Sequence, residues 1–190
     1  PAYYNEVATS CTLDKCMEHA KKLFDWENKS KVRELENGKI RSAGVAMAMQ
    51  GSGISGVDVG SATIKLEDEG YYTLSIGAAD MGTGCDTILA QMAAESLECD
   101  VDKIIVFGAD SDASPYDSGS YASSTTYVTG KAVLKACEGL KENLCKLAAE
   151  ILQCEYDELV FTGKSVKNLK TNEEVLLFDL ATKSMCANEI

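Results

Sequence analysis

The stretch Asp80-Met81-Gly82-Thr83-Gly84-Cys85-Asp86, called loop 1, runs directly into an amphipathic helical pattern. A second stretch, Ser118-Gly119-Ser120-Tyr121-Ala122-Ser123-Ser124-Thr125-Thr126, called loop 2, does the same farther along the chain. The first turn of a helix has unpaired N–H groups at the positive end of the helix dipole, and glycines let a ligand approach the backbone. This combination binds anions without lysine or arginine, so the two loops predict a phosphate-bearing cofactor.

Regular periodicities flank both loops. Apolar residues at helical spacing predict a helix over residues 85–97 and a second helix of about seven turns over residues 128–151. Alternation of apolar and polar residues predicts strands over residues 57–67 and 71–78, joined by a hairpin turn at Asp68-Glu69-Gly70. Each loop therefore lies at the start of a predicted helix.

The outer parts of the chain carry weaker patterns. We divide it into an N-terminal helical segment (residues 1–37), a core that holds both loops (38–153) and a C-terminal part of small strands and a helix (154–190). The mixture predicts an α+β fold with a curved, mostly antiparallel sheet packed by long helices. In the N-terminal part we predict a helix over 13–24, capped by Thr12 and frayed through 31, and a turn at Asn37-Gly38. In the core we predict a buried strand within 40–50 and a short strand over 104–107. In the C-terminal part we predict short strands over 159–161 and 175–178 and a last helix capped by Asp179.

Charge and hydropathy narrow the classes of partner. The 190 residues carry a formal net charge of −12, without a cluster of lysine or arginine, which makes nucleic acid and anionic membranes poor partners. No apolar run approaches the roughly 18 residues of a membrane span, and the first residues lack a signal-peptide pattern. We therefore expect a cytoplasmic protein in which uncharged donors meet any bound anion.

The chain has eight cysteines, and none of them forms a Cys-x-x-Cys pair. Several occupy apolar helix positions, which favours buried free thiols over disulfides or metal ligands. The single histidine, His19, lies among charged neighbours on a predicted helix surface. We predict no metal ligand and no catalytic triad within this chain.

Three further motifs favour structural roles. Residues 51–56 have the Gly-x-Gly-x-x-Gly spacing of a dinucleotide-binding site, but a β-rich continuation follows them instead of a helix. Two Thr-Gly-Lys triplets, at 129–131 and 162–164, lack the preceding glycine of a Walker loop and are predicted in a helix and in a turn. The acidic residues that lack the spacing of a calcium loop, and are predicted to be solvated, are Asp100, Asp102, Asp110 and Asp112.

Each loop alone leaves two interpretations open. Loop 1 fits an anion site or a tight strand-to-helix turn, and the hydroxyls of loop 2 can simply cap the next helix. Taken together, the two loops resemble the molybdenum hydroxylases, the xanthine dehydrogenase and aldehyde oxidase family, in the molybdopterin-binding half of their large subunit. The resemblance runs from about Gly44 to Ile151 and rests on residues 77–87 with Gln91, on residues 114–124, and on Gly130-Lys131-Ala132-Val133.

This resemblance implies a set of cofactor contacts. Loop 1 usually reads Met-Gly-Gln-Gly in the family, whereas this chain has Thr83 in place of the glutamine, so backbone contacts transfer better than the side-chain contact. Ala122 matches the small residue that packs nearest the molybdenum. The implied cofactor-binding residues are Gly82, Thr83, Gly84, Cys85, Ala122, Ser123, Ser124 and Thr125. No catalytic residue and no metal ligand is implied within this chain.

The resemblance also implies a function for the parent enzyme. Such an enzyme binds molybdopterin and hydroxylates an N-heterocycle or an aldehyde with oxygen from water. Its partners would be a small-molecule substrate, the rest of the molybdenum subunit, and iron–sulfur and flavin subunits or domains. The family's catalytic glutamate follows Gly-x-Gly, whereas Glu189 here follows Ala187-Asn188. We therefore expect a segment of a larger subunit, or one piece of a split subunit, that by itself holds no cofactor and has no activity.

Two other classes of function stay open: a non-catalytic assembly module, and a phosphate- or nucleotide-binding domain of another kind. The cytosine dinucleotide form of molybdopterin is likewise one of the forms that the resemblance allows. A binding site made by loop 1 and loop 2 requires both loops to lie at one face of the fold, whereas an assembly module does not.

Overall fold

The computed structural model describes residues 10–48 and 56–186, and the chain divides into two compact units, Pro1–Gly51 and Ser52–Ile190. Each unit is described by itself. Residues 51–55 of the glycine-rich motif lie outside the described residues, as does the end of the predicted strand over 40–50. The predicted boundaries at residues 37 and 153 stay predictions.

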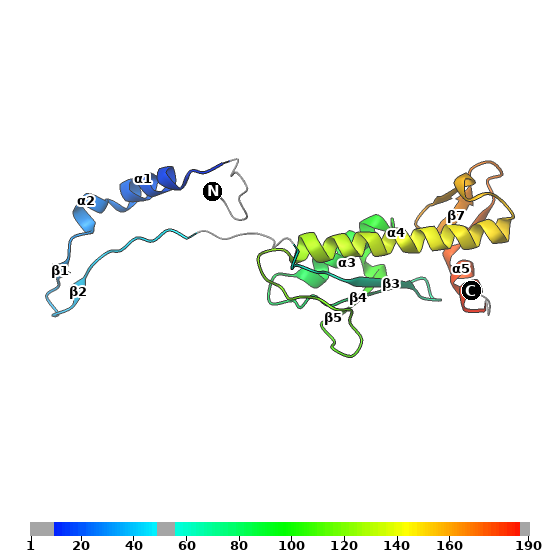
Figure 1. Cartoon of the computed structure of the whole chain (residues 1–190), viewed down its shortest axis with the longest axis horizontal. Helices are drawn as coiled ribbons and strands as arrows, with labels where there is room; N and C mark the ends of the chain where they lie inside the picture. Colours follow the sequence, from blue (N-terminus) through cyan, green and yellow to red (C-terminus); the bar gives the residue numbers. More distant parts are fainter. Residues whose placement is uncertain (1–9, 49–55, 187–190) are drawn as a thin grey trace. The chain divides into compact units, whose positions relative to one another are not determined.

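The described part of unit 1, residues 10–48, contains two short helices and one short hairpin (Figure 1). Helix α1 (Leu13–Phe24) has the predicted bounds, but Thr12 makes no side-chain hydrogen bond to it, and α2 (Trp26–Lys29) replaces the predicted frayed end. Strands β1 (Arg33–Glu34) and β2 (Ile40–Arg41) pair around the predicted turn. The Lys39 N–H donates to Asn37 Oδ1 there over 3.1 Å. No residue of α1 or α2 is buried.

The predicted buried strand over residues 40–50 is wrong for the residues that the structure describes. Only Ile40–Arg41 pairs, and the apolar side chains of Val45 and Met47 are 54% and 60% exposed. Apart from β1, no strand in the described part of the chain pairs with this segment. Without a neighbouring strand the backbone gains no ladder of hydrogen bonds, so an apolar run alone does not form a strand.

The centre of unit 2 is a three-stranded sheet in the order β3-β4-β5. Strands β3 (Ala62–Leu66) and β4 (Tyr72–Ile76) form the predicted antiparallel hairpin, while β5 (Ile104–Gly108) pairs parallel to β4. Helix α3 (Cys85–Ser96) and the 3-10 turn η2 (Val101–Lys103) connect β4 to β5. Alternate residues of β4 form the core against the helices, since Tyr72, Leu74 and Ile76 are at most 1% exposed.

Helix α4 (Thr125–Leu152) is the longest element, at about 42 Å for 28 residues. It begins three residues before the predicted start, and it continues without a break through Gly139. Its first half packs on α3 and β3, and its second half packs on the C-terminal strands and α5 (Figure 1). One helix therefore ties both parts of unit 2 together.

The C-terminal part of unit 2 is a small antiparallel sheet, β6 (Leu159–Phe161), β7 (Ser165–Asn168) and β8 (Glu174–Leu176), after the turn η3 (Tyr156–Glu158). Sequence patterns missed β7 because its residues show no apolar alternation. Helix α5 (Leu177–Cys186) begins before Asp179, which lies in its first turn instead of capping it.

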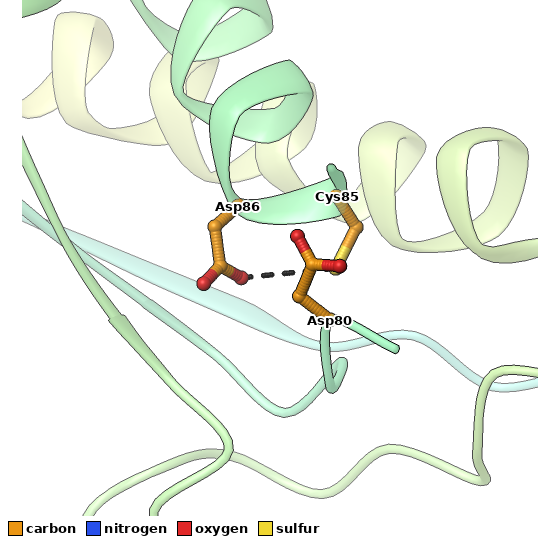
Figure 2. A group of neighbouring side chains, drawn as sticks. All are labelled: Asp80, Cys85 and Asp86. Carbon is orange, nitrogen blue, oxygen red and sulfur yellow. Dashed lines mark hydrogen bonds between the residues drawn. The ribbon is translucent and has the colours of Figure 1, made fainter. Parts of the chain in front are cut away.

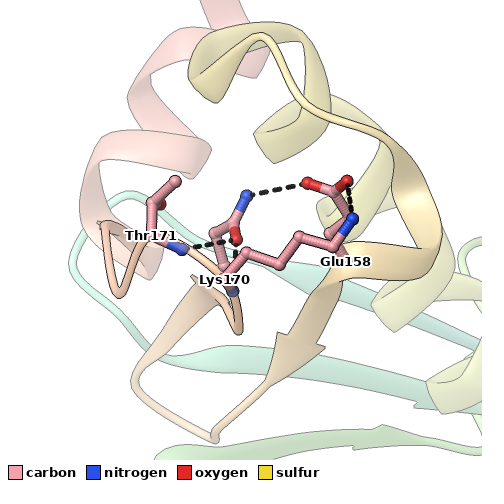
Figure 3. Close-up of polar contacts among 4 residues, drawn as sticks. Glu158, Lys170 and Thr171 are labelled. Atoms are coloured by element: carbon pink, nitrogen blue, oxygen red, sulfur yellow. Dashed lines mark hydrogen bonds and ion pairs between the residues drawn. The ribbon is translucent and has the colours of Figure 1, made fainter.

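Polar contacts shape the turn after β7 (Figure 3). The buried Asn168 accepts the backbone N–H groups of Lys170 and Thr171 at its Oδ1, over 2.7 and 3.1 Å. Lys170 Nζ donates to Glu158 Oε1 over 2.6 Å, which lowers the pKa of Glu158 and raises that of Lys170. The side chain of Asn168 therefore fixes the turn after β7 through hydrogen bonds, which no apolar alternation in the sequence indicates.

The fold is α+β, as predicted, and among the described strand pairs only β4–β5 is parallel. Three cysteines, Cys85, Cys137 and Cys145, are buried thiols, and burial raises the pKa of Cys137 to about 11. Cys16, at an apolar position of the predicted first helix, is exposed because α1 buries no residue, and Cys11, which precedes α1, is exposed as well. No helix among the described residues is long and apolar enough to span a membrane.

Candidate functional site

Loop 1 and loop 2 leave the same edge of the central sheet. Loop 1 follows β4 and loop 2 follows β5, and because these strands are parallel their carboxyl ends meet at one edge. Loop 2 also contacts the residue just before loop 1, since Ser120 Oγ donates to the Ala79 carbonyl oxygen over 3.1 Å. At Gly77, a Cβ would lie 2.7 Å from Asp117 Cβ, so only glycine allows the chain before loop 2 to pack this closely.

The helices that follow the two loops run in the same direction. Gly130 of α4 lies against Leu89 and Met92 of α3, and farther along both helices Lys141 Nζ donates to the Ser96 carbonyl oxygen over 3.0 Å. The N-termini of α3 and α4 therefore lie at the same end of the helix layer. The structure brings both loops to one edge of the fold, which is the arrangement that a shared binding site requires.

A third segment, residues 57–61, joins this edge and was not predicted to do so. The Val59 N–H donates to Ser118 Oγ over 3.2 Å, and the Ser118 N–H donates to the Val59 carbonyl oxygen over 3.2 Å. Gly60 packs on α4, where an added Cβ would lie 2.6 Å from Thr129 Cα. The buried Thr129 in turn donates to Asp117 Oδ2 over 3.1 Å, so the first Thr-Gly-Lys triplet has a structural role inside α4, as expected.

The backbone of loop 1 already has an anionic partner. Asp80 Oδ1 accepts the N–H of Gly82 over 2.8 Å and the N–H of Gly84 over 3.1 Å, and these bonds lower the pKa of Asp80. Both glycines have positive φ, +100° and +73°, which turns the two N–H groups toward one oxygen. The expectation that the loop 1 amides await a ligand is therefore incomplete, because an aspartate two residues earlier in the chain satisfies two of them.

Three acidic or thiol groups gather at the start of α3 (Figure 2). Cys85 is buried, its Sγ donates to Asp86 Oδ1 over 3.7 Å, and burial with the nearby carboxylates raises the pKa of its thiol. The Cys85 sulfur and one oxygen each of Asp80 and Asp86 lie within 4.8 Å of one another. Since Asp80 is engaged with backbone amides, we assign no metal to this group.

Loop 2 has a different construction. Ala122 and Ser123 both have left-handed backbone conformations, with φ of +51° and +53°, which cost free energy for residues other than glycine. Ser124 is buried, and its Oγ donates to the Tyr121 carbonyl oxygen over 2.9 Å. Ser124 makes no side-chain hydrogen bond to the first turn of α4. The interpretation in which the Ser124 hydroxyl caps this helix is therefore wrong.

The eight residues implied as cofactor contacts differ in accessibility. Gly82, Thr83 and Ser123 are exposed, whereas the side chains of Cys85 and Ser124 are buried and bonded within the protein. A Cβ added to Gly82 or Gly84 would meet no atom within 4 Å, so open space lies beside this backbone. A ligand at this edge would meet exposed backbone and the Thr83 side chain. The half-buried members of the set are Gly84, Ala122 and Thr125.

A separate cleft of about 710 Å³ lies at the other end of the sheet. Tyr72 at the start of β4, Lys103 just before β5 and Phe178 of α5 contribute to its walls, and no residue of loop 1 or loop 2 lines it. The volume of this cleft is therefore no guide to a binding site formed by loop 1 and loop 2. The two loops are distinguished instead by their place at the carboxyl ends of the parallel strands.

Known proteins are similar to this chain in sequence and in fold. The family model of the molybdopterin cofactor-binding domain matches residues 19–188. The chain is 36% identical over 146 residues to a probable hypoxanthine oxidase, XdhD, of Escherichia coli K12, covering 76% of this chain and 15% of that protein. It is 30% identical over 172 residues to a putative xanthine dehydrogenase molybdenum-binding subunit, XdhA, of the same organism, covering 88% and 23%. The chain thus spans less than a quarter of the length of either relative.

Solved structures have the same fold. A reconstituted CO dehydrogenase from Oligotropha carboxidovorans superposes with a TM-score of 0.63 at 24% identity, covering 69% of this chain and 16% of that one. Quinoline 2-oxidoreductase from Pseudomonas putida 86 superposes with a TM-score of 0.61 at 21% identity, covering 69% and 17%. At these identities the likeness concerns the fold alone.

Proposed function

The chain belongs to the molybdopterin cofactor-binding domain family, and from this premise we propose that loop 1 and loop 2 form part of the wall of a molybdopterin site. The observation that carries the proposal is the meeting of both loops at the carboxyl ends of β4 and β5, before two helices that run in the same direction. Ligands of sheets with parallel strands commonly bind at such an edge.

The accessible groups at this edge fit a bound cofactor. Open space lies beside Gly82 and Gly84, which lets a ligand approach the backbone, and the exposed Thr83 and Ser123 border the two loops. Cys85 and Ser124 would act from inside, by holding the start of α3 and the turn before α4 in place. When bound, molybdopterin supplies the redox chemistry of the enzyme, and these residues orient it.

The parent enzyme is proposed to be a molybdenum hydroxylase that oxidises an N-heterocycle or an aldehyde with oxygen from water. The relatives named above are an oxidase and a dehydrogenase subunit, which supports an oxidoreductase of this kind. The second relative, XdhA, is a molybdenum-binding subunit, which supports the existence of further partner chains. We propose that these partners are the rest of the molybdenum subunit together with iron–sulfur and flavin subunits or domains. The cytosine dinucleotide form of the cofactor belongs to the same proposal.

Bulky substitutions in the assembled enzyme test the cofactor site. We expect Thr83→Tyr and Ser123→Tyr to lower the molybdenum and pterin content at least tenfold, because each ring would fill space in front of its loop. Thr182→Tyr, on an exposed position of α5, is the matched control and should keep the content of the natural enzyme. Metal analysis and fluorescence of the released pterin measure both quantities, and the nucleotide freed by hydrolysis identifies the dinucleotide form.

Two results would contradict the proposal. One is a full complement of molybdenum and pterin in both loop variants. The other is an assembled natural enzyme that contains no pterin, which would favour the assembly module instead. Thermal unfolding of each variant separates loss of the cofactor from loss of the fold, since all three changes are at exposed positions.

A further inference from the structure

We propose that Asp80 is a built-in anion that keeps phosphate away from loop 1, so that loop 1 positions an uncharged part of the cofactor. The inference rests on the proposed function, because it assigns a specificity to one wall of the same site. It gives Asp80 a positioning role: the carboxylate shapes loop 1 and decides which chemistry that loop accepts, without itself taking part in a reaction.

The geometry of the two N–H groups is the first argument. The N–H groups of Gly82 and Gly84 converge on a single carboxylate oxygen, Asp80 Oδ1, at 2.8 and 3.1 Å. Both distances lie within the ordinary range of N–H···O hydrogen bonds. A phosphate oxygen that used the same donors would have to occupy the position of Oδ1, so phosphate and the Asp80 carboxylate compete for one place.

Charge is the second argument. Asp86, in the first turn of α3, places another carboxylate within 4.8 Å of the Asp80 carboxylate and the Cys85 sulfur (Figure 2). Loop 1 contains no lysine or arginine, and none of the ion pairs among the described residues includes Asp80 or Asp86. The two acids offset the positive end of the α3 dipole, and a dianionic phosphate would be repelled by both.

Tethering is the third argument. Asp80 is two residues from Gly82 in the chain, so its carboxylate competes as an intramolecular ligand whose effective concentration exceeds that of a free anion. The positive φ values of Gly82 and Gly84 already hold the N–H groups in the bonded arrangement. Phosphate would therefore have to displace a ligand that is preorganised and always present.

Inorganic phosphate is a suitable probe of the full 190-residue chain. In nitrogen–proton correlation spectra, the amide signals of Gly82 and Gly84 report directly on the two N–H groups. We expect them to stay in place in the natural chain when phosphate is added, and to shift in a saturable way in Asp80→Ala. Asp80→Asn keeps the acceptor oxygen and loses the charge, so we expect an intermediate response.

Asp110→Asn is the matched control. Asp110 is also exposed and also accepts the N–H of the residue two positions later, Asp112, over 2.9 Å, but it lies outside both loops. This variant should leave the Gly82 and Gly84 signals as unresponsive to phosphate as they are in the natural chain. A response in Asp110→Asn equal to that of Asp80→Ala would show a general effect of lost negative charge and would contradict the proposal.

Two further outcomes overturn the inference: saturable phosphate shifts of Gly82 and Gly84 in the natural chain, or no response in Asp80→Ala and Asp80→Asn alike. If alanine unfolds loop 1, seen as unfolded-chain positions of both glycine signals, the asparagine variant decides alone. Failure of the proposed function is detected separately, by cofactor content of the assembled enzyme, so the two results are distinguishable.

Discussion

Loop 1 and loop 2 both precede a long helix, but their backbones are stabilised in different ways. In loop 1, glycines adopt the left-handed conformations, and the carboxylate of Asp80 satisfies two backbone N–H groups. In loop 2, Ala122 and Ser123 adopt left-handed conformations that glycine would adopt more easily, and Ser124 donates to a carbonyl oxygen. Loop 1 is thus relaxed and satisfied, while loop 2 is strained at two successive residues.

Residue type alone therefore does not tell which hydrogen-bond donors of a loop a ligand can use. Glycines in loop 1 suggest free amides, yet an acid of the same loop bonds to them. Hydroxyls in loop 2 suggest helix caps, yet the buried hydroxyl of Ser124 is turned toward the preceding backbone. Strain in a loop that the rest of the fold holds in place is a frequent feature of binding sites.

The largest expected effect disrupts the close approach between the segment before loop 1 and the segment before loop 2. Gly77→Ala would place a methyl group against the Pro115 carbonyl oxygen and Asp117 Cβ, which are parts of the chain just before loop 2. We expect the free energy of unfolding to fall by about 3 kcal/mol, as for overpacking against backbone that has little room to move. Chemical denaturation of the natural chain and of the variant measures this difference in the free energy of unfolding.

Gly139→Ala is the control for this substitution. It adds the same methyl group in the middle of α4, where nothing lies within 4 Å, and should stabilise the protein by roughly 0.5–1 kcal/mol because alanine favours a helix. A loss at Gly77 that does not exceed about 1 kcal/mol would show that the two loops are not held by this close approach.

A reciprocal pair of substitutions sharpens the comparison of backbone strain. Gly84→Ala should cost about 1 kcal/mol, because a side chain is disfavoured at φ of +73° even though space is free there. Ala122→Gly should cost nothing and should gain up to about 1 kcal/mol, since it relieves the conformation at φ of +51°. Urea denaturation of both variants measures the signs. Equal signs would mean that the loops do not differ in strain.

The smallest expected effect is a pH dependence that belongs to loop 1. The pKa of Asp80 is lowered in the folded protein by the N–H groups of Gly82 and Gly84, so its contribution to stability is present above the ordinary pKa of aspartate. That contribution is lost as the pH falls through the lower pKa of the folded state. Asp80→Asn should therefore show a smaller loss of stability in acid than the natural chain.

Thermal unfolding between about pH 2 and pH 5 measures this difference, with Asp110→Asn as the reference for an exposed aspartate. A curve for Asp80→Asn that runs parallel to that of the natural chain would mean that the two N–H bonds of Asp80 are not formed in solution. Such a result would remove the contrast between a satisfied loop 1 and a strained loop 2.

Much of the fold follows from local patterns in the sequence. The bounds of α1, the hairpin of β3 and β4 and the start of α3 at Cys85 agree with apolar spacing and turn residues. The strand predicted over residues 40–50 fails because it has no pairing partner beyond β1 in the described chain. Strand β7 was missed because its residues show no apolar alternation, and the side-chain bonds by which Asn168 shapes the following turn leave no periodic signal either.

The family resemblance, the α+β class and the two loops could be predicted from the amino-acid sequence, because they depend on residues that are neighbours in the chain. The structure was needed to show that α3 and α4 run in the same direction, that residues 57–61 join the site, and that Ser120 donates to Ala79. It also showed that Asp80 accepts the loop 1 amides. The reason is physical: contacts between distant segments, and the choice of partner for each donor, depend on backbone conformations that packing selects.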